Sequence, residues 1–431
     1  MNSDSIYKIN FDHWFRIALS FFLVAALLGT VMRLSWITEL PLDYKNILHA
    51  HSHIAMLGWG FTIMAAVIRY VILKHTQQRR VFNIVLILNT LSGIGMMVSF
   101  SIQGYGAVSI AFSALHILVA YFFAYHALKE LKTITQGAVK FFGIWSIRWM
   151  LISTLGLWAV APVSILLGKL HPLYFASIQF FLHFQFNGWF LFGVLTFLAF
   201  FLDKKGFRLE LTKTWKWLLQ LSLLLTYALS ITWSTPEALL FYLNSAGVII
   251  QLIVFVMIGR EIFNRLQKVH FTGSPGKILL LLGLACFALK IAMQSAVAIP
   301  YVAEISYTIR NFVIGFIHMI MLGAFSLSIL ALVISNTNIV LNRLGVLGCY
   351  LLAIGFLATE ILLFTQGMLL WAEWGFMNAY YEMIFLLTVL LPISISLILW
   401  SQFNQTNVSN IPASNSKFKK IEQNIIKPEN L

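Results

Sequence analysis

Cysteine and charge are both scarce in this chain. Only two cysteines occur among 431 residues, Cys286 and Cys349, and each lies inside an apolar run. No CxxC, Cys-His or CxxCH spacing is present, so nothing indicates a disulfide framework, a cysteine zinc site or a covalently attached haem. Charged residues make up 10% of the sequence, whereas a soluble domain has about a quarter.

Several phosphate-binding and metal-binding motifs are also absent. The sequence has no GxxxxGK loop, no GxGxxG after a strand and no HExxH. Nucleotide-driven pumps and zinc hydrolases therefore lack support. The net charge of +14 comes from short Lys and Arg clusters between apolar runs, which indicates membrane topology and not nucleic-acid binding.

Long apolar runs dominate the sequence, which is 60% hydrophobic with a mean hydropathy of +0.85. They predict an all-α, polytopic membrane protein in a single transmembrane domain, 1–401, followed by a flexible cytoplasmic tail, 402–431. Twelve windows of sufficient length occur, at 14–34, 46–73, 81–103, 106–131, 144–167, 172–202, 215–235, 237–259, 277–299, 307–335, 343–366 and 379–401.

Basic residues mark alternate loops between these spans. Lys204, Lys205 and Arg208 follow the sixth span, for example, whereas the opposite loops hold acidic residues such as Glu39 and Glu304. Because Lys and Arg accumulate in cytoplasmic loops, we expect both termini in the cytoplasm. The expected location is a bacterial inner membrane, with lipid as the immediate partner.

Three histidines open the second span, in the segment ILHAHSHIAMLGWGF from Ile47 to Phe61. Residues four apart on a helix project from nearly the same face, so His49 and His53 share one side and His51 points roughly the opposite way. Imidazoles inside a membrane span are costly to bury without a role. This segment is therefore the first candidate cofactor site.

Three further histidines lie near mid-membrane: His116, His183 and His318, in the fourth, sixth and tenth spans. Around His183 the sequence places Gln179, Gln185 and Asn187. Such a polar cluster predicts a bound ligand, a metal or a water-filled path, although an interhelical packing network is the alternative. His116 is either a second ligand to the His183 site or a packing residue.

Neutral imidazoles from two helices can hold a haem between them. His318 is a candidate for one of these imidazoles. Arg310, two turns earlier, could bind a haem propionate because a guanidinium can form two hydrogen bonds with a carboxylate. Alternatively, Arg310 is an interfacial anchor. Lys290 and Glu360 also lie in apolar surroundings, as steps of a proton route or as a buried ion pair.

These motifs resemble subunit I of the haem-copper oxidase superfamily, including its nitric oxide reductases, and the related NnrS-type haem proteins. Leu48-His49 with Gly60-Phe61 resembles the second span of the reductases, and the run from His183 to Trp189 resembles their sixth. His51, His53 and Gly58 are also similar to the H-x-H-x-x-x-x-G pattern that the family places in its tenth span. The resemblance implies a fold of twelve helices.

The resemblance further implies cofactors: one haem b, or two, and a copper or non-haem iron. His49 or His53 would pair with His318 as haem ligands, His51 would face a second cofactor or a neighbouring hydrogen-bond partner, and Arg310 would hold a propionate. The candidate metal ligands are His49, His53, His116, His183 and His318.

Two departures limit what the resemblance implies. The family uses two histidines at the start of the seventh span and paired histidines in the tenth, whereas here the seventh span has none, the tenth has one, and Asn187 stands at an acidic position. The ligand set for copper or non-haem iron is therefore incomplete.

The sequence thus predicts a haem-binding oxidoreductase-like membrane protein that transfers electrons or reduces or binds a diatomic gas, nitric oxide or oxygen. A quinol or a cytochrome would be the electron donor. A nitric-oxide-stress haem protein without turnover, like NnrS, is the alternative, and a proton-coupled transporter is a further one. The sequence names no partner subunit.

Overall fold

The protein is an all-helical bundle. A computed structural model describes residues 10–73, 79–135, 137–271 and 273–403, and all regular secondary structure in these ranges is helical. The expected tail from residue 402 lies outside them, except for Gln402 and Phe403, which end the last helix.

Eleven of the twelve expected spans are long, apolar helices of membrane-crossing length in the described ranges. They are Phe11–Leu34 (α2), Tyr44–Ile72 (α3, η1 and α4), Arg79–Gln103 (α5), Ala107–Leu131 (α6), Gly137–Leu166 (α7), Pro172–Lys204 (α8, η2 and α9), Ala238–Leu266 (α11), Ser274–Ala296 (α12), Arg310–Asn336 (α14, η4 and α15), Arg343–Trp371 (α16) and Tyr380–Phe403 (α17).

The remaining expected span, 215–235, is divided. An α-helix, α10 (Lys213–Thr226), continues as a tighter 3₁₀ helix, η3 (Tyr227–Ile231), and the chain then turns before α11. Pro236 contributes to this break because it lacks a backbone N–H and disfavours helix in the residue before it. A short helix that the apolar windows did not separate, α13 (Pro300–Thr308), begins at Pro300.

Three spans contain a wide π-helical turn, and each turn begins directly after a histidine. The segments are η1 (Ile54–Gly60) after α3 (Tyr44–His53), η2 (Phe184–Phe190) after α8 (Pro172–His183), and η4 (Met319–Leu327) after α14 (Arg310–His318). In each case the histidine is followed five residues later by a glycine: Gly58, Gly188 or Gly323. The same local pattern therefore recurs in all three spans.

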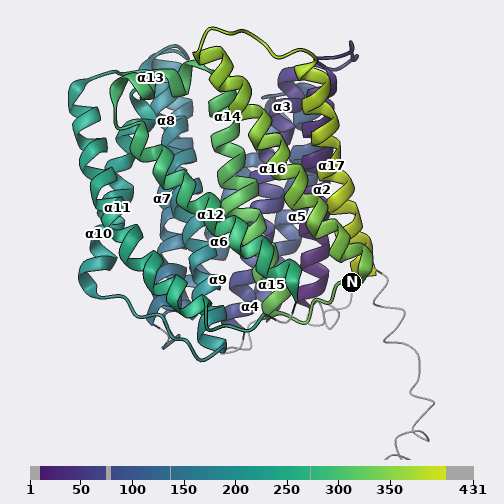
Figure 1. Cartoon of the computed structure of the whole chain (residues 1–431), viewed down its shortest axis with the longest axis vertical. Helices are drawn as coiled ribbons and strands as arrows, with labels where there is room; N and C mark the ends of the chain where they lie inside the picture. Colours follow the sequence, from purple (N-terminus) through teal and green to yellow (C-terminus); the bar gives the residue numbers. More distant parts are fainter. Residues whose placement is uncertain (1–9, 74–78, 136, 272, 404–431) are drawn as a thin grey trace, which may run out of the picture.

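These three spans form the centre of the bundle. In their most apolar stretches 78% to 94% of residues are buried, against 56% or less in the other eight. The π segments meet one another: the Trp59 indole N–H donates to Ser326 Oγ at 2.8 Å, and the rings of Phe190 and Phe325 lie 4.7 Å apart. α3, α8 and α14 lie in one half of the bundle, and the continuations α4 (Phe61–Ile72), α9 (Leu191–Lys204) and α15 (Ser328–Asn336) lie in the other (Figure 1).

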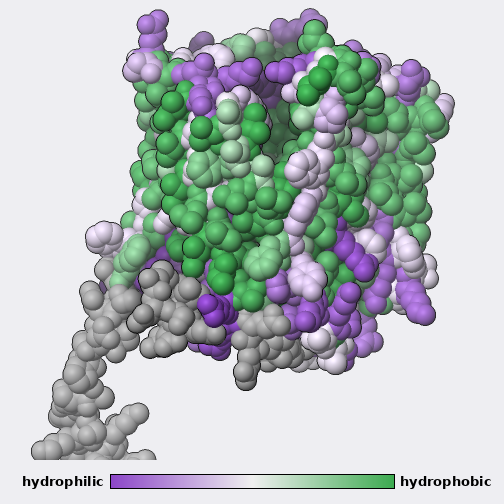
Figure 2. All heavy atoms as spheres, turned by 180° about the vertical axis from the view of Figure 1, so that it is seen from behind, coloured by the Kyte–Doolittle hydropathy of each residue, from purple (hydrophilic) through white to green (hydrophobic). Residues whose placement is uncertain are grey.

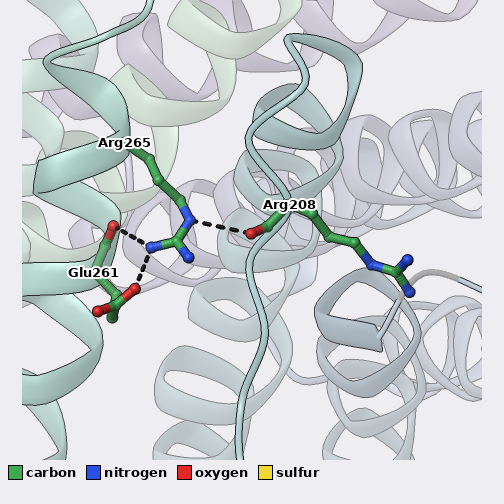
Figure 3. Close-up of polar contacts among 3 residues, drawn as sticks. All are labelled: Arg208, Glu261 and Arg265. Carbon is green, nitrogen blue, oxygen red and sulfur yellow. Dashed lines mark hydrogen bonds and ion pairs between the residues drawn. The ribbon is translucent and has the colours of Figure 1, made fainter.

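The outer surface is an apolar belt between two polar rims (Figure 2). The start of α2 and the end of α17 lie at the same end of the bundle (Figure 1), and α17 packs against α2. At this end a loop is fixed to α11: the Arg265 guanidinium donates to the carbonyl of Arg208 at 3.1 Å and pairs with Glu261 one turn earlier (Figure 3). The chain therefore forms one multi-pass membrane bundle.

Candidate cofactor site

His51 faces the first span. Its Nδ1 lies 2.8 Å from the carbonyl oxygen of Ala25 on α2, and Gly29, one turn later, leaves room for the imidazole because a Cβ there would come within 3.1 Å of His51 Cε1. When Nδ1–H donates to a carbonyl, the lone pair is on Nε2, which is the arrangement typical of a histidine that binds a metal. Nε2 of His51 has no hydrogen-bond partner among the described residues.

His318 ends α14, about 12 Å along the helix axis from Arg310. Its Nδ1 lies 3.8 Å from Oε1 of Glu360 on α16, and 29% of its side chain is accessible although it lies in a central span. Accessible surface at that depth means that the imidazole lines an internal opening.

Arg33 and His51 lie close enough to His318 to act on it electrostatically. Arg33, at the end of α2, also interacts with Tyr44, Arg310, Glu360 and Tyr380. The His51 and His318 side chains, from different central spans, therefore share one region with a guanidinium beside it.

A polar rim lies at the outer end of this region. The Arg310 guanidinium donates to Tyr44 Oη at 3.4 Å and lies over the Tyr44 ring, and Asn311 donates to Tyr380 Oη at 2.7 Å. Arg310 is exposed, so it acts at the mouth of the region. Two guanidiniums at one mouth, those of Arg33 and Arg310, match the two carboxylates of a haem.

His49 and His53 face the opposite way, as the helical spacing predicts. Both contact Phe100 and Tyr105, and the His53 ring stacks on Phe100 with ring centres 4.0 Å apart. His53 Nδ1 is 2.8 Å from the carbonyl of His49, which leaves its Nε2 free as well. The nearest deep histidine on this side is His116, not His318.

His116 is held by an asparagine. Its Nδ1 lies 2.8 Å from Oδ1 of Asn89, whose amide donates to Thr62 Oγ1 and to the Leu57 carbonyl, and Phe61 packs edge-on against its ring at 4.8 Å. Aromatic rings thus occupy the space beside both His53 and His116. The structure does not bring His116 to His183.

His183 is buried and uses both ring nitrogens. Its Nε2–H donates to the carbonyl of Leu223 at 2.9 Å, and Nδ1 lies 3.4 Å from the Asn187 amide and from Ser230 Oγ. Gln185, from the same polar cluster, donates to Ser153 instead. In the part of the chain that the structure describes, no three His, Cys, Asp or Glu side chains converge in a way that could hold a metal ion. A copper or non-haem iron does not fit the residues around His183.

Sequence reasoning missed two members of the site. Arg33 is a single basic residue at the end of an apolar run, a pattern typical of an interfacial anchor. The sequence feature that could have assigned Arg33 to the site is its position at the same membrane level as Tyr44 and Arg310. Glu360 was noted only as a proton-route or ion-pair residue, and its position opposite His318 depends on the packing of α16 against α14.

The comparisons with known proteins agree with this architecture. No protein-family model and no curated protein matches the chain. Among solved structures, the cryo-EM structure of a heme-copper terminal oxidase dimer aligns with a TM-score of 0.66 at 14% sequence identity, over 90% of this chain and 83% of the oxidase chain. The protein is thus a multi-pass membrane protein with a fold like that of haem-copper oxidase subunit I, as its motifs predicted.

Proposed function

We propose that the protein binds one b-type haem between α3 and α14, with Nε2 of His51 and Nε2 of His318 as the axial ligands. The observation that carries this proposal is the pair of imidazoles on different central spans. His51 Nδ1 is 2.8 Å from the Ala25 carbonyl, His318 Nδ1 is 3.8 Å from Glu360 Oε1, and Nε2 of neither ring has a hydrogen-bond partner among the described residues. The sequence favoured His49 or His53 as the partner of His318; the contacts of His51 support His51 instead.

Each residue has a defined part in this proposal. The Ala25 carbonyl orients the His51 imidazole, Glu360 lies beside His318 at 3.8 Å as a nearby carboxylate, and Arg33 and Arg310 would pair with the propionates. When bound, the haem supplies one-electron redox chemistry. If His51 and His318 both hold the haem, it would suit electron transfer better than binding of a gas.

The function that the geometry supports best is therefore electron transfer within the membrane, with a quinol or a cytochrome as donor. Reduction of nitric oxide or oxygen would need a second, open centre, and the residues around His183 do not provide one. The basic loops lie at the end of the bundle where the described chain begins and ends. This supports a cytoplasmic location for that end.

The proposal predicts a coloured protein. The full chain, purified from haem-replete cells, should contain about one haem b per chain by pyridine haemochrome, with a sharp low-spin α band after reduction. A preparation that stays colourless, even after incubation with haemin, would refute it.

A further inference from the structure

A cavity of about 610 Å³ lies between α11, α12 and the central spans. Its inner wall includes Val194 of α9 and Ala324 of η4, which are buried, whereas Val256 and Phe263 of α11 on its other side are 61% and 55% exposed. Because its walls belong both to the core and to the lipid-facing surface, the cavity opens sideways toward the membrane. Its volume lies within the range of about 300–1,000 Å³ that is typical of ligand pockets.

The interior of this cavity is predominantly apolar. Apart from Arg260, the only polar side chains among the described residues that line it are those of Gln251 and Ser328. Gln251 Oε1 and Ser328 Oγ are both covered by protein atoms, so neither oxygen offers surface to a ligand. A hydrocarbon chain therefore fits this interior better than a polar ring, which needs accessible hydrogen-bond partners.

The mouth of the cavity carries one positive charge. Arg260, near the end of α11, is exposed and takes part in none of the ion pairs found in the described ranges. The basic residues near it differ, because Arg208 is paired with Glu210 and Arg265 with Glu261 (Figure 3). A guanidinium stays charged at physiological pH, so Arg260 brings an uncompensated cation to the mouth.

The length of the cavity matches one leaflet of a bilayer. From Gln251 to Arg260, both of which line the cavity, α11 rises by about 14 Å. The hydrocarbon core of a bilayer is about 30 Å thick, so one leaflet contributes about 15 Å of it. The cavity therefore runs from the basic end of the bundle to about the middle of the membrane.

We propose that this cavity binds one anionic phospholipid from the leaflet at the basic end of the bundle, with the phosphate at Arg260 and one acyl chain in the apolar interior. The chain supplies dispersion contacts that an empty cavity would lack. Basic pockets between membrane helices are typical sites of anionic lipid headgroups. This site goes beyond the proposed haem and does not depend on it.

Native mass spectrometry of the full-length protein in detergent, titrated with phosphatidylglycerol or with phosphatidylcholine, tests the site. Phosphatidylglycerol should form one saturable adduct per chain, bound roughly fivefold more tightly than phosphatidylcholine, and Arg260→Gln should abolish this preference. Ala285→Phe, which enlarges an exposed side chain on the cavity wall, should weaken the binding of both lipids. Both positions are exposed, so the variants should fold.

Arg343→Gln is the matched control, because Arg343 is an exposed arginine at the start of α16 that does not line the cavity; it should keep the preference. Equal binding of the two lipids by the wild type, or an equal loss in Arg343→Gln and Arg260→Gln, would overturn the role of Arg260. A phosphatidylglycerol with a photoreactive acyl chain should label α11 and α12, and labelling confined to other helices would overturn the placement of the chain.

Discussion

The imidazoles of the central spans are distinguished by what lies beside them. His51 and His318 lie near Arg33 and Glu360, whereas His53 stacks on Phe100 and His116 packs against Phe61. Both nitrogens of His183 have partners. Helical spacing is sufficient to predict that His49 and His53 lie opposite His51. It does not predict which face meets the tenth span, because that depends on how the helices are ordered around the centre.

The Arg33 guanidinium beside His318 would make the oxidation of the proposed haem less favourable. Removing one positive charge favours the more positive, oxidised iron, so Arg33→Gln should lower the midpoint potential of the haem. A loss of about 1 kcal/mol corresponds to roughly 40 mV for one electron. Redox titration of the α band measures this shift in midpoint potential.

Arg16→Gln is the control for this prediction. Arg16 lies on the same helix, near its other end, and stacks over Phe403. An equal shift in potential for both variants would show that Arg33 has no specific relation to the haem.

At the scale of the helices, the sequence did not predict the π-helical turns inside the three central spans. Apolar runs predict where a span lies because burial in lipid requires them, and eleven of twelve expected spans are membrane-length helices. A wide turn inside a span depends on what the neighbouring helices permit. Here Gly58, Gly188 and Gly323 allow close approach of Phe21, Trp149 and Cys286, which lie on α2, α7 and α12.

Gly188 tests the packing of these turns. A methyl group added there collides with Cβ of Trp149, whose ring is stacked on Phe184, so neither partner can move freely. Gly188→Ala should destabilise the protein by about 1–3 kcal/mol and lower its melting temperature in detergent.

Gly259→Ala is the corresponding control, because Gly259 lies within α11 and no atom lies within 4 Å of an added Cβ. Alanine there should be neutral or stabilise the helix by up to about 1 kcal/mol. If the two variants melted alike, the close packing at Gly188 would not contribute to stability.

At the scale of the whole molecule, the bundle has a fold like that of a haem-copper terminal oxidase, with few histidines in its central spans. The alignment over 90% of the chain at 14% identity shows that the fold persists where the side chains differ. The sequence predicted the fold class because topology follows from apolar runs and charge. The site was predicted less completely, because Arg33 and Glu360 reach it only through tertiary packing.

The most direct test of the account is the low-spin haem signal in four single variants, recorded by optical and electron paramagnetic resonance spectroscopy. His51→Ala and His318→Ala should each abolish the bis-imidazole signal, and His49→Ala and His53→Ala should keep it. A His51→Ala protein that retains the signal, together with its loss in His49→Ala or His53→Ala, would contradict the proposed site and place the haem on the opposite face of α3.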